Sequence, residues 1–369
     1  MADTSYQRGK NLSRFKSGEK SKKEIKILGA GISGLTASIV LARAGYKVKV
    51  FEKRSRIGSF LEKDVHSLKN YIYDYDIIKK YKKLGITISN FYPIYKEVRF
   101  SSSLESIEIS SKKEPLFYNI IRGYGDGRSL DVDLFEQAKK KGVEFLFSQK
   151  INSKKNSMDI IATGARYRKG LVYGYHYKNV SMKPNAVYFF LNSNRSSYGY
   201  TYVNPFEKEA SIAIVSPERD SKKYLKRRIG SIKKNKVIDK VIKKAKLEND
   251  FFGYAYFKLP KTAVKNGKLY VGEAAGFLDA STGFGVHYAI MSGYLAAQSI
   301  IEEKDYDKLW KNSFGEELKR RYLRRKSFKK MGIKKQKKMI SKLIKKHGEK
   351  ISMNDYMKIY KKIPQEVNV

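Results

Sequence analysis

The stretch that decides the fold covers residues 24 to 52 and reads EIKILGAGISGLTASIVLARAGYKVKVFE. Apolar residues at its start predict a buried strand, and a second apolar strand is predicted just before its last residue. Between the strands, small residues predict a helix that begins in a glycine turn. The turn consists of Gly29, Ala30, Gly31, Ile32, Ser33 and Gly34, and the second strand is followed by Glu52 and Lys53.

Each part of this stretch has a physical role in binding a dinucleotide. Gly29 allows the tight turn, Gly31 lets the backbone approach a pyrophosphate, and Gly34 lets the helix pack against the strand. The positive end of the helix dipole faces the phosphates. Glu52 follows Gly34 by 18 residues, near the spacing at which a carboxylate reaches a ribose hydroxyl. The stretch therefore predicts a dinucleotide site formed by residues 29–34, 52 and 53.

The composition limits the remaining possibilities. A chain of 369 residues can bury a sizeable core and is expected to form two domains with appendages. The 28 tyrosines and 19 phenylalanines exclude a disordered polycation. The absence of cysteine excludes disulfides, thiolate metal sites and cysteine catalysis. The four histidines, at positions 66, 176, 287 and 347, lack metal-ligand spacing, so no metal is predicted.

No apolar run in the sequence approaches the roughly 18 residues that a membrane span needs. Residues 1–23 are polar and basic and lack the apolar segment of a secretory signal. We therefore expect a flexible basic tail on a cytoplasmic protein.

The formal net charge of +42 is not evenly distributed. Residues 319–346 contain 15 Lys or Arg and no acid, with apolar residues at spacings of 3, 4 and 7. This pattern predicts a basic amphipathic helix, or a helix pair broken near Gly332. The segment is expected to dock on the body of the protein. Attraction to an anionic membrane surface is the second interpretation, and nucleic-acid binding is the third and least favoured.

A second glycine motif occupies residues 268–293 and reads KLYVGEAAGFLDASTGFGVHYAIMSG. It predicts a buried strand, a glycine turn, a loop and a helix. An acid just after such a strand can bond a ribityl hydroxyl, and N–H groups at the start of the helix can stabilise negative charge on a reduced ring. Together, the two motifs predict a site for both ends of an extended FAD. The ligands predicted from the second motif are Gly272, Glu273, Gly283, Phe284, Gly285 and Val286.

With both motifs in view, the chain resembles FAD-dependent oxidoreductases of the group that holds para-hydroxybenzoate hydroxylase, and within it the geranylgeranyl reductase family. That family's pattern reads roughly G-D-A-A-G-x-x-x-P-x-T-G-x-G-I-x-x-A-x-x-S-G. Residues 272–293 follow it with two changes, Glu273 for Asp and Ala280 for Pro. Glu273 keeps the carboxylate at the end of a longer side chain.

Three further segments carry the resemblance, which covers residues 24–300 in all. Arg128 and the helix that follows resemble a family segment whose arginine approaches the cofactor, and Gly164 ends a strand that resembles the family's A-D-G strand end. Tyr198, Tyr200, Tyr202 and Pro205 resemble the reductases' G-Y-x-W-x-F-P, which lines the substrate cavity. Tyr202 stands where Trp is usual and Asn204 where Phe is usual.

The fold class that follows is α/β, with a Rossmann-like FAD-binding domain, a mostly antiparallel β-sheet substrate domain and a basic α-helical C-terminus. A helix is expected over residues 71–84. The FAD-binding domain is expected to be discontinuous, formed by residues 24–62, 120–165 and 265–304. The substrate domain is assigned to residues 63–119 and 166–264, and the basic helical region to residues 305–369.

The resemblance implies that reduced FAD delivers hydride to a C=C bond of a prenyl, geranylgeranyl-type lipid. No second strand–G-x-G-x-x-G–helix unit is present, so the electrons are expected from transient NAD(P)H or an external carrier. His287 is the candidate proton donor, against the plainer interpretation of a hydrogen-bonded histidine. Two alternatives stay open: a flavin monooxygenase that hydroxylates a small or aromatic molecule, and a tRNA-associated flavoprotein, which only the charge favours. An isoprenoid substrate and a basic C-terminus are also compatible with a peripheral position on the membrane.

Overall fold

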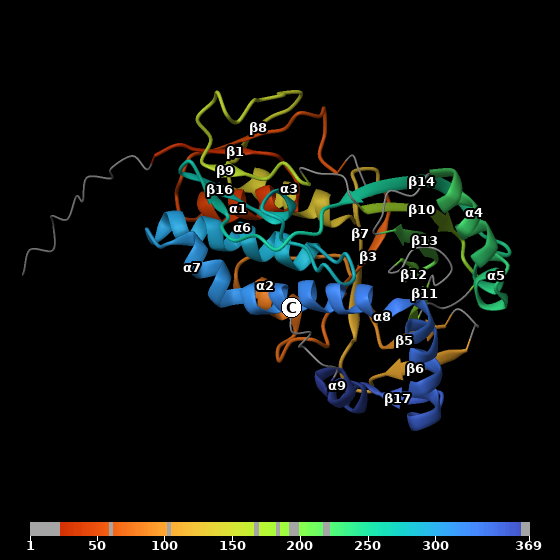
Figure 1. Cartoon of the computed structure of the whole chain (residues 1–369). Coiled ribbons are helices and arrows are strands. Elements are labelled where there is room, and N and C mark those ends of the chain that lie inside the picture. The colour runs from red at the N-terminus through yellow and green to blue at the C-terminus, as the bar shows by residue number, and fades with distance from the viewer. Residues whose placement is uncertain are drawn as a thin grey trace, which may run out of the picture.

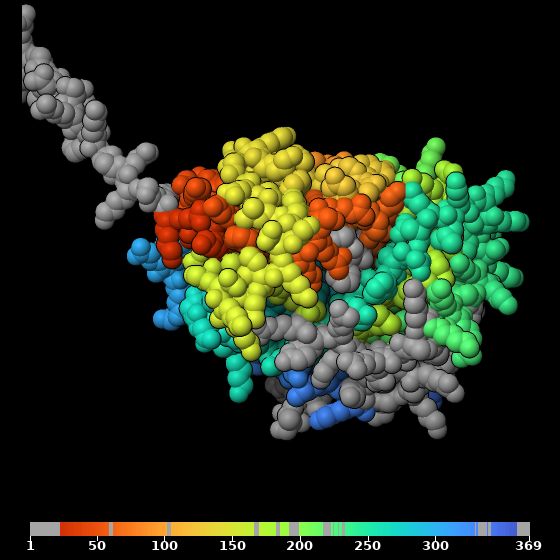
Figure 2. Space-filling view, turned by 90° about the horizontal axis from the view of Figure 1, so that it is seen from above, coloured from red at the N-terminus to blue at the C-terminus, as the bar shows by residue number. Residues whose placement is uncertain are grey.

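The computed structural model describes residues 23–58, 62–101, 105–165, 170–181, 185–191, 199–216 and 222–362. The predicted basic tail lies outside this part of the chain, apart from residue 23. Two large sheets occupy different ends of the molecule, and a small third sheet lies between them (Figure 1). From above, the red and yellow segments of the first large sheet stand apart from the green segments near residues 220–250 (Figure 2).

The first sheet is built around the opening glycine motif. β1 (Ile25–Leu28) pairs in parallel with β2 (Val48–Phe51) on one side and β9 (Ile160–Ile161) on the other. α1 (Ile32–Arg43) connects β1 to β2 and packs against α3 (Leu130–Lys140) and α6 (Val286–Ile301). This parallel arrangement with a helical crossover confirms the predicted Rossmann-like domain. The strand order is β15-β16-β9-β1-β2-β8, completed by β8 (Glu144–Leu146), β16 (Lys268–Tyr270) and the antiparallel edge β15 (Val264–Lys265).

The second sheet has eight strands, and most of its neighbours run antiparallel, as predicted. The exceptions are the parallel pairs β11–β5 and β6–β17. The strands, in the order β14-β10-β13-β12-β11-β5-β6-β17, are Lys246–Ala255, Gly170–Lys178, Glu209–Ser216, Tyr200–Phe206, Ala186–Leu191, Lys96–Phe100, Ser106–Ser110 and Lys350–Ser352.

Two helices cover the outer face of this sheet. α4 (Lys222–Lys233) and α5 (Lys236–Ile242) direct apolar side chains, including Leu225 and Ile238, onto Ile212 and Ile214 of β13. Because successive side chains of a strand point to opposite faces, the alternate residues of β12 and β13 face the interior of the molecule. The inner face is therefore available to line a cavity.

The third sheet lies between the two large ones. β7 (Phe117–Ile121) is flanked by β3 (Val65–Lys69) and β4 (Tyr92–Ile94), both antiparallel to it. α2 (Ile77–Lys83) is shorter than the helix expected over residues 71–84. It begins at Ile77 because the Asp76 side chain accepts a hydrogen bond from the Lys79 N–H and caps it.

The C-terminal region is part of the body of the protein. α7 (Tyr306–Trp310) and a π-helical turn lead into α8 (Glu316–His347), which runs unbroken through Gly332. The prediction of one amphipathic helix is confirmed, and the alternative of a helix pair broken near Gly332 is wrong. α8 buries Leu318 in the main core, and the chain then adds β17 to the large sheet before α9 (Met353–Lys362) (Figure 1). No helix in the described ranges is both long and apolar enough to cross a bilayer.

The strands of the six-stranded sheet come from three separated parts of the chain, residues 25–51, 144–161 and 264–270. The eight-stranded sheet takes strands from residues 96–110 and 170–255, and its last strand from the C-terminal region. The exact domain boundaries stay a prediction.

Candidate functional site

The first glycine turn is fixed by backbone packing. Gly29 has a φ of +110°, and a Cβ added there would lie 2.4 Å from the Ala162 carbonyl oxygen. A Cβ on Gly34 would lie 2.0 Å from the Gly29 carbonyl oxygen. A Cβ on Gly31, in contrast, would meet no protein atom within 4 Å. Gly29 and Gly34 are therefore needed by the protein itself, whereas Gly31 borders open space at the N-terminus of α1.

Glu52 connects the end of β2 to this turn. Its carboxylate accepts hydrogen bonds from the Ala30 N–H at 2.9 Å and from the Arg54 N–H at 3.0 Å. Lys53, beside it, is exposed. Glu52 thus positions the turn, and its contact with a ribose stays a prediction.

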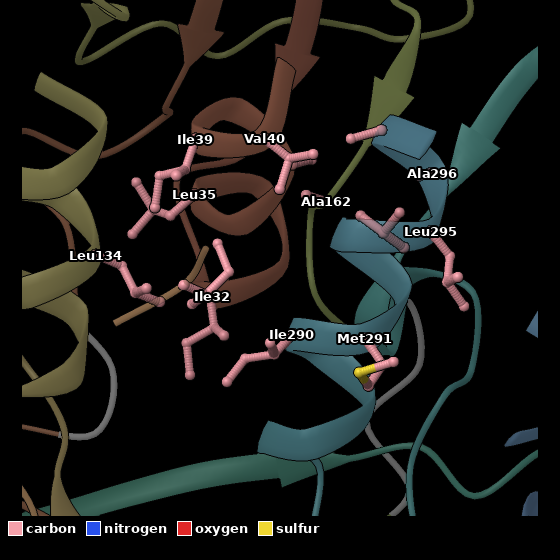
Figure 3. Packing of buried hydrophobic residues seen from close by; sticks show 14 of the residues in the cluster. Ile32, Leu35, Ile39, Val40, Leu134, Ala162, Ile290, Met291, Leu295 and Ala296 are labelled. Atoms are coloured by element: carbon pink, nitrogen blue, oxygen red, sulfur yellow. The ribbon is translucent and has the colours of Figure 1, made fainter. Parts of the chain in front are cut away.

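The second glycine motif meets the first through two helices. α1 and α6 lie side by side, with Ile32 and Leu35 on one and Ile290 and Met291 on the other (Figure 3). A Cβ on Gly293 of α6 would lie 2.3 Å from the Ser33 carbonyl oxygen, so the helices approach at backbone distance. This packing places Gly293, the last residue of the second motif, next to the glycine turn of the first.

Glu273 is the acidic residue that follows β16. Its side chain is half-buried and lines the cavity described below. Burial raises the pKa of Glu273 to about 7, and the positive charge of Arg122 lowers that pKa by a smaller amount. No hydrogen bond from a described residue reaches its carboxylate. An unpaired, partly buried carboxylate of this kind is available to accept hydroxyl groups from a ligand.

The loop between β16 and α6 is fixed by side chains from distant parts of the chain. Asp279 is buried and accepts hydrogen bonds from Lys69 Nζ at 2.8 Å and Thr282 Oγ1 at 2.7 Å. Arg321 of α8 lies 3.7 Å from the same carboxylate. Although burial alone would raise it, these two cations hold the pKa of Asp279 well below its usual range. Arg325 of α8 also donates to the Ala280 carbonyl at 3.2 Å.

Sequence reasoning missed Lys69 and Arg321. Lys69 is far from the loop in sequence, and its Nζ lies 4.3 Å from the centre of the Phe284 ring. Arg321 lies inside the basic run, where nothing distinguishes it from its exposed neighbours. Its burial is the only sign of its role, and burial is a property of the fold.

A cavity that opens to solvent lies between the loop and the inner face of the large sheet. The sheet contributes Val172, Phe189, Tyr200, Tyr202 and Val215. The opposite wall consists of β3, the loop around Gly283 to Gly285, and the start of α6 from Val286 to Tyr288.

The predicted substrate-cavity residues divide into three groups. Tyr200 and Tyr202 line the cavity, and the Tyr200 hydroxyl donates to the Thr282 carbonyl of the loop. Pro205 is buried in β12, where its carbonyl accepts from Asn119, and its neighbour Asn204 lines the cavity. Tyr198 lies outside the described residues.

His287, the candidate proton donor, also lines the cavity. Its Nδ1 lies 2.8 Å from the Tyr81 hydroxyl, and its ring packs 4.7 Å from that of Tyr73. Burial lowers the pKa of His287 to about 3, so the imidazole is neutral near pH 7. The contacts favour a positioning role, and catalysis by His287 stays a prediction.

Two nearby arginines of the sequence, Arg122 and Arg128, pair with different carboxylates. Arg128 bonds three carboxylates, Asp126 at 2.7 Å, Glu209 at 2.9 Å and Glu207 at 3.1 Å. Arg122 instead bonds Asp131 through two contacts of 2.7 and 3.1 Å, and its charge reaches Glu273. Contact between Arg128 and the cofactor stays a prediction, and the positive charge of Arg122 partly offsets the effect of burial on the pKa of Glu273.

Gly164, which follows β9, has a φ of +75° and, like Gly283, no protein atom within 4 Å of an added Cβ. Gly31, Gly164 and Gly283 therefore leave unfilled space beside both motifs. The described residues contain no cluster of three His, Cys, Asp or Glu that could bind a metal.

Comparisons with known proteins agree with this arrangement. Residues 27–77 match the NAD(P)-binding Rossmann-like domain. An uncharacterised protein of Methanocaldococcus jannaschii is 28% identical over 188 residues, 46% of this chain and 48% of its own length. The chain thus spans about half of that relative.

Several solved structures share the fold. A geranylgeranyl bacteriochlorophyll reductase-like protein of Thermoplasma acidophilum has a TM-score of 0.69 at 22% identity, over 86% of this chain and 90% of that one. A flavin-dependent brominase mutant has a TM-score of 0.61 at 16% identity, over 91% and 99%. A flavoprotein/dehydrogenase from Cytophaga hutchinsonii has a TM-score of 0.57 at 16% identity, over 84% and 86%. The chain has the fold of flavin-dependent oxidoreductases, and its resemblance to geranylgeranyl reductases is confirmed at the level of that fold.

Proposed function

We propose that this protein is an FAD-dependent oxidoreductase. The observation that carries the proposal is that the two glycine motifs pack against each other through α1 and α6, with open space beside a glycine of each and an unpaired carboxylate in the second. Gly31 and Gly283 each border open space, and Gly283 and Glu273 line the cavity. The residues present fit an extended dinucleotide, because the backbone N–H groups at the N-termini of α1 and α6 would stabilise its charged portions.

The residues that would bind FAD divide between its two ends. Residues 29–34 and Glu52 would bind the nucleotide half, and Glu273 with residues 283–286 would bind the flavin half. FAD, when bound, supplies hydride chemistry. The chain's own contribution is to fix the loop through Lys69 and Asp279 and to exclude water with the aromatic wall of the large sheet.

We further propose that the substrate is a prenyl lipid whose C=C bond is reduced, with electrons from NAD(P)H or an external carrier. Two observations support this. The walls of the cavity carry Val172, Phe189 and Val215, which suit a long apolar chain. A protein described as geranylgeranyl bacteriochlorophyll reductase-like shares the fold.

The test separates reduction from oxygenation. The purified chain is reconstituted with FAD, reduced anaerobically by light with EDTA as the electron donor, and mixed with a geranylgeranyl lipid. Loss of the reduced-flavin spectrum with a product heavier by two hydrogens supports the proposal. Re-oxidation that needs oxygen and adds one oxygen atom to an aromatic compound would establish the monooxygenase alternative instead. A chain that binds no FAD would contradict both the reductase and the monooxygenase hypotheses.

We also propose that the exposed basic residues of α8 bind an anionic membrane surface. Leu343 and Ile344 of α8 pack on the large sheet, so one side of the helix is occupied by the protein itself. Lys319, Lys326 and Lys330 are exposed. Each basic group near such a surface contributes about 1 kcal/mol, over a Debye length of roughly 8 Å in physiological salt.

Truncating α8 would not test this interaction, because Arg321 and β17 belong to the fold. The informative variant is the triple charge reversal of Lys319, Lys326 and Lys330 to Glu. Its matched control reverses Lys140, Lys141 and Lys150, which are equally exposed beside the six-stranded sheet. We expect the α8 variant alone to lose salt-sensitive sedimentation with acidic liposomes. If both variants lost sedimentation equally, the binding would depend on the net charge of the protein and not on α8.

A further inference from the structure

The floor of the cavity, where β12 crosses β3, contains a buried polar atom without a partner. Asn204 is 3% exposed and lines the cavity. Its Nδ2 donates to the Val65 carbonyl at 2.8 Å. Its Oδ1 has no hydrogen-bond partner among the described residues. Buried acceptors are almost always paired in folded proteins, so an unpaired one at a cavity wall indicates a missing donor.

The orientation of the Asn204 amide follows from its contact with β3. If the amide were flipped, Oδ1 would face the Val65 carbonyl oxygen, and two acceptors would repel each other at 2.8 Å. Nδ2 therefore points to β3, and Oδ1 is the atom left for a donor.

The polar side chains of the surrounding network bond other groups and leave Asn204 Oδ1 without a donor. The Tyr202 hydroxyl donates its only proton to Asp64, at 3.0 and 3.1 Å from the two carboxylate oxygens. His66 Nε2 lies 2.8 Å from the same carboxylate, which is fully buried. The Asn119 amide donates to the Pro205 carbonyl. The side chains around Asn204 thus form hydrogen bonds that do not involve its Oδ1.

We propose that Asn204 Oδ1 is the acceptor of a polar subsite that binds a hydroxyl group of the substrate at the cavity floor. The inference rests on the proposed function in taking this cavity as the substrate site. The substrate is then an amphiphile, with an apolar part along Val172, Phe189 and Val215 and an alcohol or phenol O–H directed to β12. A purely hydrocarbon end would leave Asn204 buried and unpaired.

The experiment compares ligands that differ only in this donor. The FAD-loaded full chain is titrated with farnesol and farnesyl methyl ether, and separately with para-cresol and its methyl ether, by calorimetry and by changes in flavin absorbance. We expect an alcohol or phenol to bind at least about tenfold more tightly than its ether, equivalent to about 1.4 kcal/mol. Asn204→Leu, of similar size, should remove the preference and leave ether binding unchanged.

The outcomes separate the subsite from the proposed function. Equal affinity for both members of each pair, no detectable binding of either alcohol, or a preference that survives Asn204→Leu overturns the subsite. The wild-type comparison decides even if the variant fails to fold. A preference confined to the cresol pair keeps the subsite and removes the prenyl substrate. A chain without FAD removes the proposed oxidoreductase, while calorimetry on that same chain still tests the subsite.

Discussion

The two glycine turns of this protein are stabilised in different ways. The turn at residues 29–34 is shaped by backbone contacts, since added Cβ atoms on Gly29 and Gly34 would collide with carbonyl groups. The loop at residues 279–285 is shaped by side chains, above all by Lys69 and Arg321 around the buried Asp279. The first turn is limited by backbone atoms of the turn itself and of residue 162, whereas the second depends on charged side chains from a distant strand and a distant helix.

This difference has a consequence for how each turn responds to change. A backbone-shaped turn fails when any side chain is added at its tight positions. A loop fixed by buried charges fails when one charge is removed, because its partners remain buried and unpaired. Substitutions in the two turns should therefore differ in their dependence on pH as well as in size.

The largest effect is expected in the first turn, from Gly34→Val. The new Cβ would lie 2.0 Å from the Gly29 carbonyl oxygen, and neither helix nor strand can move without breaking the core. We expect a loss of more than about 4 kcal/mol in the free energy of unfolding, or no folded protein. Urea unfolding followed by circular dichroism measures it.

Gly31→Val is the matched control within the same turn. Because no protein atom lies within 4 Å of its Cβ, stability should change by less than about 1 kcal/mol. FAD retention should nevertheless fall by at least about tenfold, since the side chain occupies the space of the pyrophosphate. If Gly31→Val keeps its flavin, the nucleotide half is placed elsewhere.

The same contrast explains what could be predicted from the sequence. Rossmann-like topology and both glycine motifs follow from local patterns, because the strand, turn and helix each involve neighbouring residues. The sequence pattern left one helix and a broken helix pair open for α8, because Gly332 is a helix breaker in isolation. The strand β17 did not follow, since Lys350–Ser352 pairs only once β6 is in place. The predicted range of α2 was too long, because the Asp76 side chain caps the helix and makes it begin at Ile77.

The side chains that complete the site could not be predicted from local sequence patterns, because their roles come from tertiary contacts. In the sequence, nothing marks Arg321 among the basic residues of α8, and its role appears only in its contact with Asp279. Asp64 likewise has no sequence signal, and its role appears only in its hydrogen bond from Tyr202. Such pairings depend on the relative placement of whole layers. Asn204 was visible as a departure from the resembled pattern, but its unpaired oxygen required the structure.

In the second loop, Asp279→Asn should cost about 3–5 kcal/mol at pH 7, because Lys69 and Arg321 lose their shared counter-charge. The folded-state pKa of Asp279 is lowered, so its stabilisation is complete above its unfolded pKa of about 3.9 and is lost as pH falls below that value. Urea unfolding between pH 6 and pH 3 should show this loss in the wild type and a flatter profile in the variant.

Asp74→Asn, an exposed carboxylate near α2, is the control and should change stability by less than about 0.5 kcal/mol. A wild-type profile as flat as that of Asp279→Asn would show that the charges around this loop do not stabilise it. The loop would then resemble the first turn in being shaped by its backbone.

Glu273→Gln changes a residue that lies between β16 and the second loop. We expect it to change the free energy of unfolding by less than Asp279→Asn does, and to increase it. Burial raises the folded-state pKa of Glu273 to about 7, above its unfolded value. The ligand-free wild type therefore loses stability as pH rises from about 4.5 to 7, and the loss persists above 7. At pH 8 the variant should be more stable by on the order of 1–3 kcal/mol, with no difference near pH 4.

That gain should be confined to the protein without cofactor. If Glu273 accepts hydroxyl groups of FAD, the variant should bind the flavin more weakly, since Gln presents a neutral acceptor. Thermal unfolding with and without added FAD measures both effects. A variant that is less stable than the wild type at pH 8 would contradict the raised pKa.

The smallest effect is expected for His287→Gln, a change in the helix that follows the second loop. Gln can still bond the Tyr81 hydroxyl, and the pKa of His287, lowered to about 3 by burial, places its titration outside the working range. Because an imidazole that stays neutral from pH 6 to 8 carries no titrating proton there, we expect turnover within about tenfold of wild type and an unchanged pH profile. Loss of a general acid typically costs 10²–10⁴-fold. A fall of that size, or the disappearance of a pH break present in the wild type, would make His287 a catalytic residue and show that the start of α6 contributes chemistry as well as shape.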